Sequence, residues 1–352
     1  MNLVKKAADY LPGFALAVVI AAAAKFLEGL LPVPLIGASV IAMFIGMLIN
    51  SFRRPGKALL PGLKFTSKKI LKFAIILLGA SLNITTVLTV GRNSLLVMLF
   101  TLATCFGLGQ ISGRLLHLNW KMSNLISAGT GICGGSAIAA IAPVIDADDL
   151  DIAFGLSATF LFDMAMIVLF PIFGRAIGLT DVVYGLWAGT AVNDTSSVVA
   201  AGFAFSETAG NYATMVKLTR TLAIIPTVLI FALVNMYLKK KEAAEAGGNA
   251  VKTGTDKLQV NMKSVFPWFI LGFLALSALN SIGLIPAAAG SSLKDISKFL
   301  MVAALAAIGL NTSFRDMRKA GPAPMLHGFI ISALVVVVAI AVIWFENLHG
   351  ML

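Results

Sequence analysis

The chain has 352 residues, of which 59% are hydrophobic and only 12% are Asp, Glu, Lys or Arg, and its mean hydropathy is +0.93. A soluble globular domain carries roughly 25% charged residues. The composition therefore excludes a soluble domain and predicts an all-α polytopic membrane protein. The net charge of +11 does not indicate nucleic-acid binding. The basic residues lie in short stretches between apolar runs, which is typical of cytoplasmic loops.

The apolar runs predict a single transmembrane domain, 1–352, with about eleven segments. These segments are 13–31, 34–51, 70–90, 94–115, 123–145, 150–173, 182–205, 212–238, 265–282, 299–311 and 325–345. Lys5 and Lys6 precede the first run, which we interpret as a retained helix because another segment follows at once. We divide the domain into a first half, 1–175, and a second half, 182–352, and predict a flexible cytoplasmic linker at 239–263.

Lys and Arg gather in alternate loops, which predicts an N-terminus inside the cell and a C-terminus outside. In the eleven-segment interpretation, the acidic run from Asp146 to Asp151 lies outside and Arg175 lies inside. An alternative remains, in which two glycine-rich segments are re-entrant hairpins. About nine spans are then left, both termini keep their sides, and the acidic run moves inside.

Those two segments carry the motifs AGTGICGGS, 128–136, and AGTAVNDTS, 188–196. Glycine costs roughly 1 kcal/mol relative to Ala within a helix, and small hydroxyl and amide side chains compete for backbone hydrogen bonds. We therefore expect both helices to break or unwind. In a bilayer such backbone is tolerated only where it is buried in protein or lines a wet cavity, and paired breaks indicate the binding site of a transporter.

The predicted substrate-binding residues come from these motifs and from the segment that follows them. They are Gly129, Thr130, Gly131, Cys133, Gly134, Gly135, Ser136, Gly189, Thr190, Asn193, Asp194, Thr195, Ser196, Lys217 and Arg220. The ends of the half-helices would offer backbone N–H groups to an anion. Arg220 suits a planar or tetrahedral oxyanion.

Charged residues within apolar segments are functional candidates by default. Asp163 is interpreted either as a structural partner of a cation or as a proton or sodium site. Asp194 either coordinates a cation or caps the half-helix that follows it. Lys217 either extends to the outer surface or faces the cavity. Asp163, Asp194 and Asn311 are the candidates for a coupling ion, and for Asn311 the alternative is a helix-end cap.

Two internal similarities are present. Segment 71–91 resembles segment 297–321, with Phe73 matching Phe299 and Asn83 matching Asn311. The two would cross the membrane in opposite directions, as an inverted repeat requires. The two glycine-rich motifs form the second pair. They run parallel if both span the membrane, and they enter from opposite faces if both are hairpins.

Neither cysteine, Cys105 or Cys133, has metal-ligand spacing, and no His, Cys and carboxylate residues cluster in the sequence as a metal site would need. No Ser-His-Asp arrangement and no P-loop is present. We therefore predict no enzyme activity, no cofactor and no metal.

Four stretches together resemble the YeiH-type family of conserved bacterial membrane proteins, whose members are often called sulfate exporters. They are GTGICGGSAIAAIAPVI at 129–145, AGTAVNDTSSVVAAG at 188–202, VKLTR at 216–220 and AAIGLNTSF at 306–314. The family usually has a histidine before the Asp-Thr-Ser of the second motif, where this chain has Asn193. The resemblance implies the superfamily of cation/proton antiporters and bile-acid symporters, with inverted repeats and crossing discontinuous helices.

The sequence thus predicts a multi-pass secondary transporter of the bacterial inner membrane that moves a small anion, such as sulfate, a sulfonate or a carboxylate. H⁺ or Na⁺ would be the coupling ion, lipid the surroundings, and a homodimer an ordinary assembly. The first alternative is a Na⁺/proton antiporter that uses Asp163 and Asp194. The second is a channel-like or holin-related membrane protein, whose fluxes would not saturate.

Overall fold

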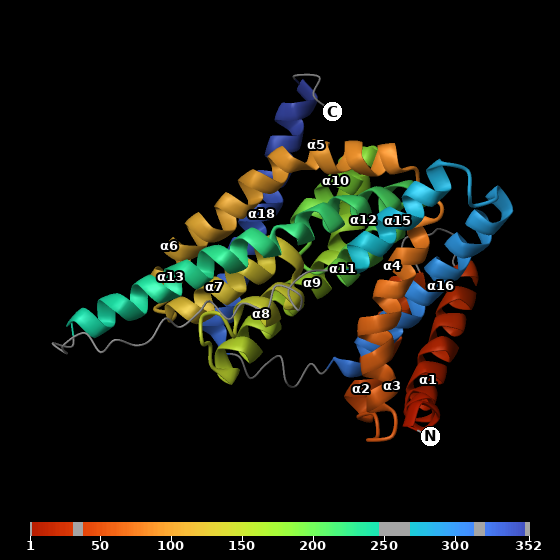
Figure 1. Ribbon diagram of the computed structural model, residues 1–352, viewed down its shortest axis with the longest axis horizontal. Coiled ribbons are helices and arrows are strands. Elements are labelled where there is room, and N and C mark those ends of the chain that lie inside the picture. Colours follow the sequence, from red (N-terminus) through yellow and green to blue (C-terminus); the bar gives the residue numbers. More distant parts are fainter. Residues whose placement is uncertain (1, 31–37, 246–267, 313–320, 349–352) are drawn as a thin grey trace.

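The computed structural model describes residues 2–30, 38–245, 268–312 and 321–348, and this part of the chain is helical without a strand (Figure 1). The α-helices are α1 (Asn2–Leu30), α2 (Ala38–Phe52), α3 (Leu60–Phe65), α4 (Leu71–Gly79), α5 (Ile84–Ala103), α6 (Gly109–Leu115), α7 (Trp120–Ala128), α8 (Gly135–Ile141), α9 (Asp149–Ala176), α10 (Asp181–Ala191), α11 (Thr195–Phe205), α12 (Glu207–Leu222), α13 (Ile224–Glu245), α15 (Trp268–Ser281), α16 (Ala287–Asn311) and α18 (Pro322–Leu348).

Three short π-helical turns complete the helical segments. Thr66–Ile70 joins α3 to α4, Thr104–Leu108 joins α5 to α6, and Gly129–Cys133 continues α7. Within the described ranges, five helical segments are long and apolar enough to cross a membrane, namely 9–30, 84–115, 150–176, 207–238 and 322–348. The prediction of an all-α polytopic membrane protein is therefore confirmed.

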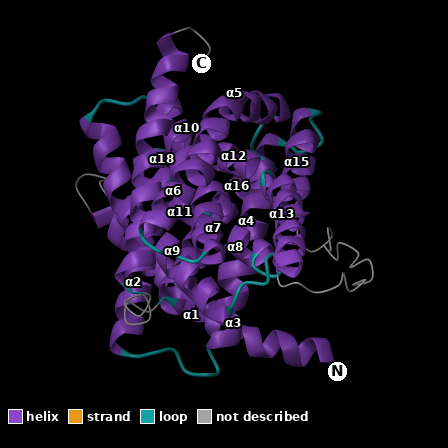
Figure 2. Cartoon of the chain, turned by 90° about the vertical axis from the view of Figure 1, so that its left-hand side faces the viewer, coloured by secondary structure: helices purple, strands orange, loops and turns teal. Residues whose placement is uncertain are grey.

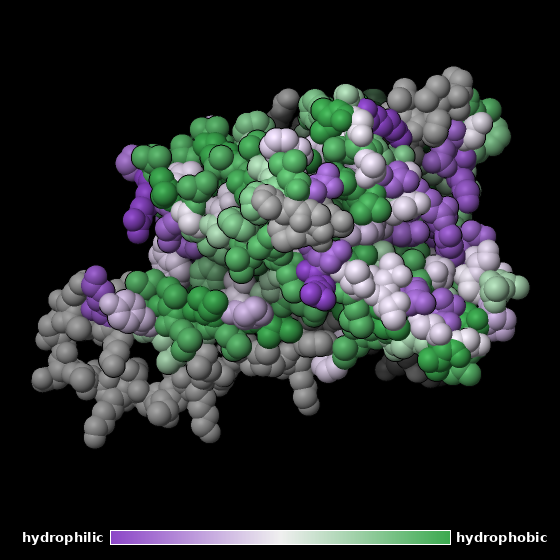
Figure 3. All heavy atoms as spheres, turned by 90° about the horizontal axis from the view of Figure 1, so that it is seen from above, coloured by the Kyte–Doolittle hydropathy of each residue, from purple (hydrophilic) through white to green (hydrophobic). Residues whose placement is uncertain are grey.

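Large apolar side chains cover the outside of the molecule, as a bilayer requires. Val19 on α1, Leu99 on α5 and Trp344 on α18 are all about two-thirds exposed. Figure 3 shows hydrophobic residues spread widely over one face. Exposed apolar surface of this extent marks a membrane or protein contact. Together with the long apolar helices, it indicates that lipid surrounds the molecule.

The helices form two units, which Figure 1 shows to the right and to the left. The scaffold unit comprises α1 to α4, α15 and α16, and the core unit comprises α5 to α13 and α18. Within the scaffold unit, α2 and α16 approach very closely, because a Cβ added at Gly309 would lie 2.0 Å from the Met43 carbonyl oxygen. Ser297 of α16 also donates to the Ala74 carbonyl of α4 at 2.6 Å. The two segments of the first predicted repeat thus lie side by side.

The two units meet along an apolar surface. Met43 of α2 and Leu305 of α16 belong to one buried cluster with Met164 and Ile167 of α9 and Ala200 of α11. Apolar contact is non-directional. Methionine side chains also adapt their shape readily. Such a surface is suited to relative movement of the two units.

The first glycine-rich segment is a re-entrant hairpin. Asn119, which caps α7, donates to the Asp151 carboxylate at 2.8 Å, and Lys121 donates to the Asp146 carbonyl at 2.7 Å. These bonds join the residues that precede the segment to those that follow it. A continuous helix of this length would separate its ends by about 30 Å. The segment therefore enters and leaves on the same side. We call α7, its π-helical turn and α8 hairpin 1.

The second glycine-rich segment, α10 and α11, also turns back, and we call it hairpin 2. Arg175, near the end of α9, donates to the Ala204 carbonyl at 2.7 Å and to the Phe205 carbonyl at 3.1 Å. The Tyr184 ring, in the first turn of α10, stacks on Phe205 with ring centroids 3.9 Å apart. Because α9 crosses between the two hairpins, they enter from opposite faces.

This arrangement selects the prediction of about nine spans and two hairpins. The eleven-segment interpretation is wrong, because neither glycine-rich segment crosses. The hairpins also differ from the crossing discontinuous helices that the resemblance implies. The acidic run from Asp146 to Asp151 consequently lies on the side of Lys121, which we predict to be inside, and Arg175 moves to the outer side.

Two further observations concern the ends of the chain and the predicted linker. Figures 1 and 2 place the start of α1 and the end of α18 at opposite extremes of the molecule, in agreement with the predicted topology. Helix α13 continues through Glu245, so the predicted linker 239–263 begins as helix, and its remainder lies outside the described residues. The division into halves remains a prediction.

Candidate functional site

The two hairpins meet at their tips, near the middle of the molecule. Helix α10, at eleven residues, is about 16 Å long, which is about half of a 30 Å hydrocarbon core. Gly134, at the tip of hairpin 1, has φ +62°, and a Cβ added there would lie 2.7 Å from Asp194 Oδ1 of hairpin 2. Only glycine therefore permits both this turn and this approach.

Arg220 of α12 connects the two tips. Its Nε donates to the Gly131 carbonyl at 2.5 Å and Nη2 to the Thr130 carbonyl at 2.5 Å, both in hairpin 1. Its Nη1 donates to the Val192 carbonyl of hairpin 2 at 3.3 Å. The side chain is fully buried. In lipid each unsatisfied backbone group costs several kcal/mol, so one guanidinium stabilises both breaks.

Lys217 and Asp163 hold the tip of hairpin 2 from opposite directions. Lys217 Nζ donates to the Val192 carbonyl at 3.0 Å and also to the Asn193 carbonyl. The Asp163 carboxylate, in the middle of α9, accepts from the backbone N–H of Asn193 at 2.9 Å and of Asp194 at 3.0 Å. Both side chains are fully buried.

These contacts decide between the interpretations that the sequence leaves open. Lys217 does not extend to the outer surface, because none of its side chain is exposed. The hydrogen bonds of Asp163 come from backbone N–H groups, which do not ionise, and Lys217 lies near enough to interact with its charge. Asp163, Asp194, Lys217 and Arg220 bring two acidic and two basic side chains to the tips.

Asp194 caps α11, as one of its two interpretations predicts. Its Oδ2 accepts from the Ser196 backbone N–H at 2.9 Å and from the Ser196 hydroxyl. Thr195 is the first residue of α11 and is half-buried. Because Asp194 Oδ1 lies against Gly134, the same carboxylate caps one hairpin and touches the other.

Helix α8 of hairpin 1 begins without a side-chain cap. The first N–H groups of a helix have no partner within it. Gly135 is half-buried at this position and Ser136 is exposed. The start of α8 therefore presents backbone N–H groups and an exposed hydroxyl, and it directly follows the π-helical turn whose carbonyls bind Arg220.

Two buried polar atoms near the tips have no hydrogen-bond partner. They are Thr130 Oγ1 and Asn193 Oδ1, and both side chains are fully buried. The Asn193 amide nitrogen lies 3.3 Å from the Ser332 hydroxyl of α18. Buried polar atoms are usually paired by protein or by ordered water. These two oxygens are therefore available to a water or an ion.

Other predicted residues serve packing. A Cβ at Gly129 would lie 2.7 Å from Thr159, and one at Gly189 would lie 2.7 Å from Val216. Thr190 donates to the Leu186 carbonyl of its own helix at 2.7 Å. Cys133 is buried in an apolar cluster, so it does not face an open cavity.

Asn311 is not part of the tip region. It is the last residue of α16, in the scaffold unit, and its side chain is exposed. Asn50 of α2 binds the carbonyls on either side of it, those of Leu310 at 2.7 Å and Thr312 at 2.9 Å. In the structure Asn311 is thus a helix-end residue.

Sequence reasoning did not find Ser332, or the roles of Asn119, Lys121 and Arg175 in closing the hairpins. Lys121 and Arg175 carried only a topology signal, and Asn119 and Ser332 carried none. Among the described residues no three His, Cys, Asp or Glu side chains are arranged to hold a metal ion.

Comparison with known proteins places this architecture in a family. A family described as "Conserved hypothetical protein 698" matches residues 12–328. A UPF0324 membrane protein of Clostridium tetani is 54% identical over 343 residues, which cover 97% of this chain and 98% of that protein. The chain belongs to the UPF0324 family of membrane proteins.

Other UPF0324 membrane proteins are similar over most of their length. That of Streptococcus agalactiae is 39% identical over 91% of this chain and 92% of its own, and that of Streptococcus mutans is 42% identical over 84% and 86%. The hairpins and the charged residues at their tips lie within the region shared with the UPF0324 proteins.

Proposed function

We propose that this UPF0324 protein is a secondary transporter of the bacterial inner membrane that carries a small anion by alternating access. One observation carries the proposal: two half-depth hairpins from opposite faces meet around buried charges. Irregular backbone at membrane depth is typical of a transporter's binding site. At a site between the two tips, a single hairpin separates the substrate from each side of the membrane.

The start of α8 supports an anionic substrate. Its N–H groups are uncapped, and the positive end of a helix attracts anions. The Ser136 hydroxyl adds a donor, and Lys217 and Arg220 add positive charge. Sulfate, a sulfonate and a carboxylate all match this set of donors.

The position of Asp194 supports coupling to a proton. Its carboxylate lies against Gly134, directly before α8, so its negative charge opposes an anion at that helix end. Protonation of Asp194 would remove this repulsion. The substrate and the proton would then bind together, which is the thermodynamic requirement for coupled transport.

A Na⁺/proton antiporter is the second candidate, and a different observation favours it. Asn193 Oδ1 and Thr130 Oγ1, which have no hydrogen-bond partner, could act as oxygen ligands. Asp163 and Asp194 are in contact, because the Asp163 carboxylate accepts from the Asp194 backbone N–H. Oxygen ligands suit hard cations. This candidate predicts dependence on Na⁺ and no response to anions.

Binding and flux of purified protein would separate these candidates. We expect sulfate, methanesulfonate or acetate to raise the melting temperature, because a ligand at 100 times its Kd adds about 2.7 kcal/mol to stability. Ser136→Ala should weaken that binding about tenfold or more, since a hydrogen bond to a charged group contributes about 1.5–3 kcal/mol. Ser157→Ala, at a half-buried serine on α9 whose hydroxyl donates to the Ala153 carbonyl, is the control.

The remaining outcomes are equally specific. A shift with Na⁺ alone, lost in Asp194→Asn, would overturn the anion transporter in favour of the antiporter. Uptake into proteoliposomes should saturate with anion concentration. Flux that rises linearly would instead indicate the channel-like alternative, which has no coupled cycle.

A further inference from the structure

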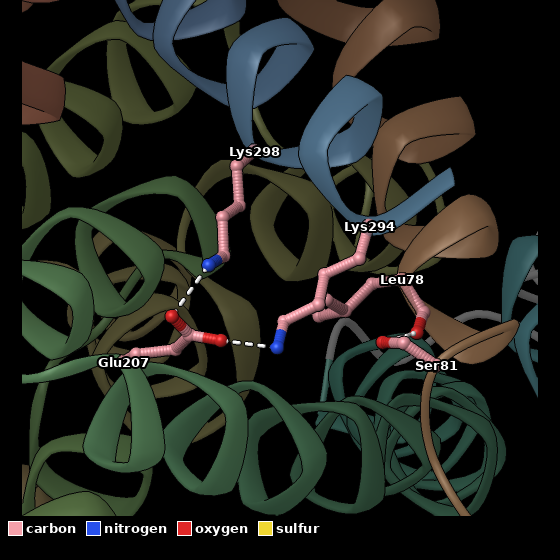
Figure 4. A network of polar contacts seen from close by, with 5 residues as sticks. All are labelled: Leu78, Ser81, Glu207, Lys294 and Lys298. Carbon is pink, nitrogen blue, oxygen red and sulfur yellow. Dashed lines mark hydrogen bonds and ion pairs between the residues drawn. The ribbon is translucent and has the colours of Figure 1, made fainter. Parts of the chain in front are cut away.

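A carboxylate of the core unit is bound by two lysines of the scaffold unit. Glu207, the first residue of α12, forms ion pairs with Lys294 and Lys298 of α16 (Figure 4). Each lysine takes a different oxygen: Lys294 takes Oε1, and Lys298 takes Oε2 at 2.7 Å. The cluster lies on the side that we predict to be extracellular.

The two lysines form a preformed pair. They are four residues apart on one helix, so they lie on the same face. Their side chains are only 31% and 27% exposed, whereas that of Glu207 is 49% exposed. The lysine side chains are therefore partly covered by the protein, and the Glu207 carboxylate is the more exposed partner in both ion pairs.

The Glu207 carboxylate shows which ligand this pair accepts. A carboxylate presents two oxygens to two ammonium groups, and sulfate and sulfonate present oxygens in the same way. Glu207 directly follows hairpin 2 and its capping residue Ser206. Any movement of the core unit against the scaffold unit would carry Glu207 away from α16 and leave both lysines facing the gap.

We propose that Lys294 and Lys298 form an outer binding site for the transported oxyanion, which Glu207 occupies when the outer face is closed. This inference rests on the proposed anion transport. The substrate replaces Glu207 at the two lysines as the outer face opens. The two lysines then keep a negatively charged partner when the outer face opens. The anion makes its first contact with the protein at these lysines.

The test is the response of Glu207→Gln to sulfate, measured by thermal melting in detergent with chloride at equal ionic strength as the reference. The neutral amide that replaces the carboxylate no longer competes with sulfate for the two lysines. A competitor within the protein lowers the apparent affinity for sulfate in proportion to the fraction of molecules whose lysines are free, and ion pairs as exposed as these are weak. We therefore expect half-maximal stabilisation at about three- to tenfold lower sulfate than in the unmodified protein.

Matched variants make the result specific. Asp295→Asn removes the same charge from the neighbouring exposed residue and should leave the sulfate response unchanged. Adding Lys294→Met and Lys298→Met to Glu207→Gln should abolish the gain. An unchanged response in Glu207→Gln, or a gain that persists without the lysines, would overturn the proposal.

The same measurements separate this site from the one at the hairpin tips. In a Ser136→Ala background, the gain from Glu207→Gln should persist if the outer site binds the anion itself. If Glu207→Gln gains affinity for sulfate but proteoliposomes show no anion uptake, the outer site stands and the proposed function fails. If proteoliposomes take up the anion but Glu207→Gln gains no affinity for sulfate, the proposed function stands and the outer site is overturned.

Discussion

Replacement of Arg220 by methionine tests whether the hairpin tips are stabilised as the structure indicates. The variant keeps a long apolar side chain but leaves the buried carbonyls of Thr130 and Gly131 without their charged donor, whereas the Val192 carbonyl keeps its bond from Lys217. A buried polar group without a partner costs about 1–3 kcal/mol, so two cost about 2–6 kcal/mol. The desolvation of the guanidinium, no longer required, offsets part of this. Loss of one partner from a buried charge interaction typically costs about 3–5 kcal/mol, and we expect a value in that range.

The assay is thermal melting of purified protein in detergent, followed by intrinsic fluorescence. At about 2 °C per kcal/mol, the melting temperature should fall by at least about 6 °C. Arg92→Met, at an exposed arginine on α5, is the matched control and should change it little. Arg220→Lys keeps the charge without the planar fork and should lie between the two. If Arg220→Met has the same melting temperature as the Arg92→Met control, the guanidinium does not stabilise the tips and the reasoning is refuted.

Two further predictions test the turn and the topology. Gly134→Ala should destabilise the protein by at least about 1–2 kcal/mol more than Gly178→Ala, measured by melting, since both have positive φ but only Gly134 has a neighbour within 4 Å; equal losses would contradict the contact between the tips. Cysteines at the exposed positions Asp148 and Ile177 should react with a membrane-impermeant maleimide from the cytoplasmic and the outer side respectively. The reverse pattern would restore the eleven-segment topology.

The breaks themselves were predictable because they depend on local chemistry. Glycine, threonine and asparagine at 128–136 and 188–196 weaken a helix wherever they occur. The structure places a π-helical turn and Gly134 in the first stretch, and a gap between α10 and α11 in the second. The cap at Asp194 is equally local, since its partner Ser196 is two residues away.

The partners of the charged residues were not predictable. Arg220 binds carbonyls 89 and 90 positions away, and Asp163 binds N–H groups 30 and 31 positions away. The sequence predicted a cation as one interpretation of the partner of Asp163, because opposite charges attract each other, but it did not show that the hydrogen bonds go to the backbone. Backbone groups, which every residue carries, give no signal in a sequence.

By itself, the sequence determined that the protein is an all-α polytopic membrane protein with two weakened segments, because hydropathy and helix propensity are properties of neighbouring residues. Only the tertiary structure decided that these segments turn back, and that they do so from opposite faces. That choice rests on bonds between the ends of each hairpin, such as Lys121 to Asp146 and Arg175 to Ala204. A sequence does not show such contacts between distant residues, so only the structure distinguishes the two interpretations.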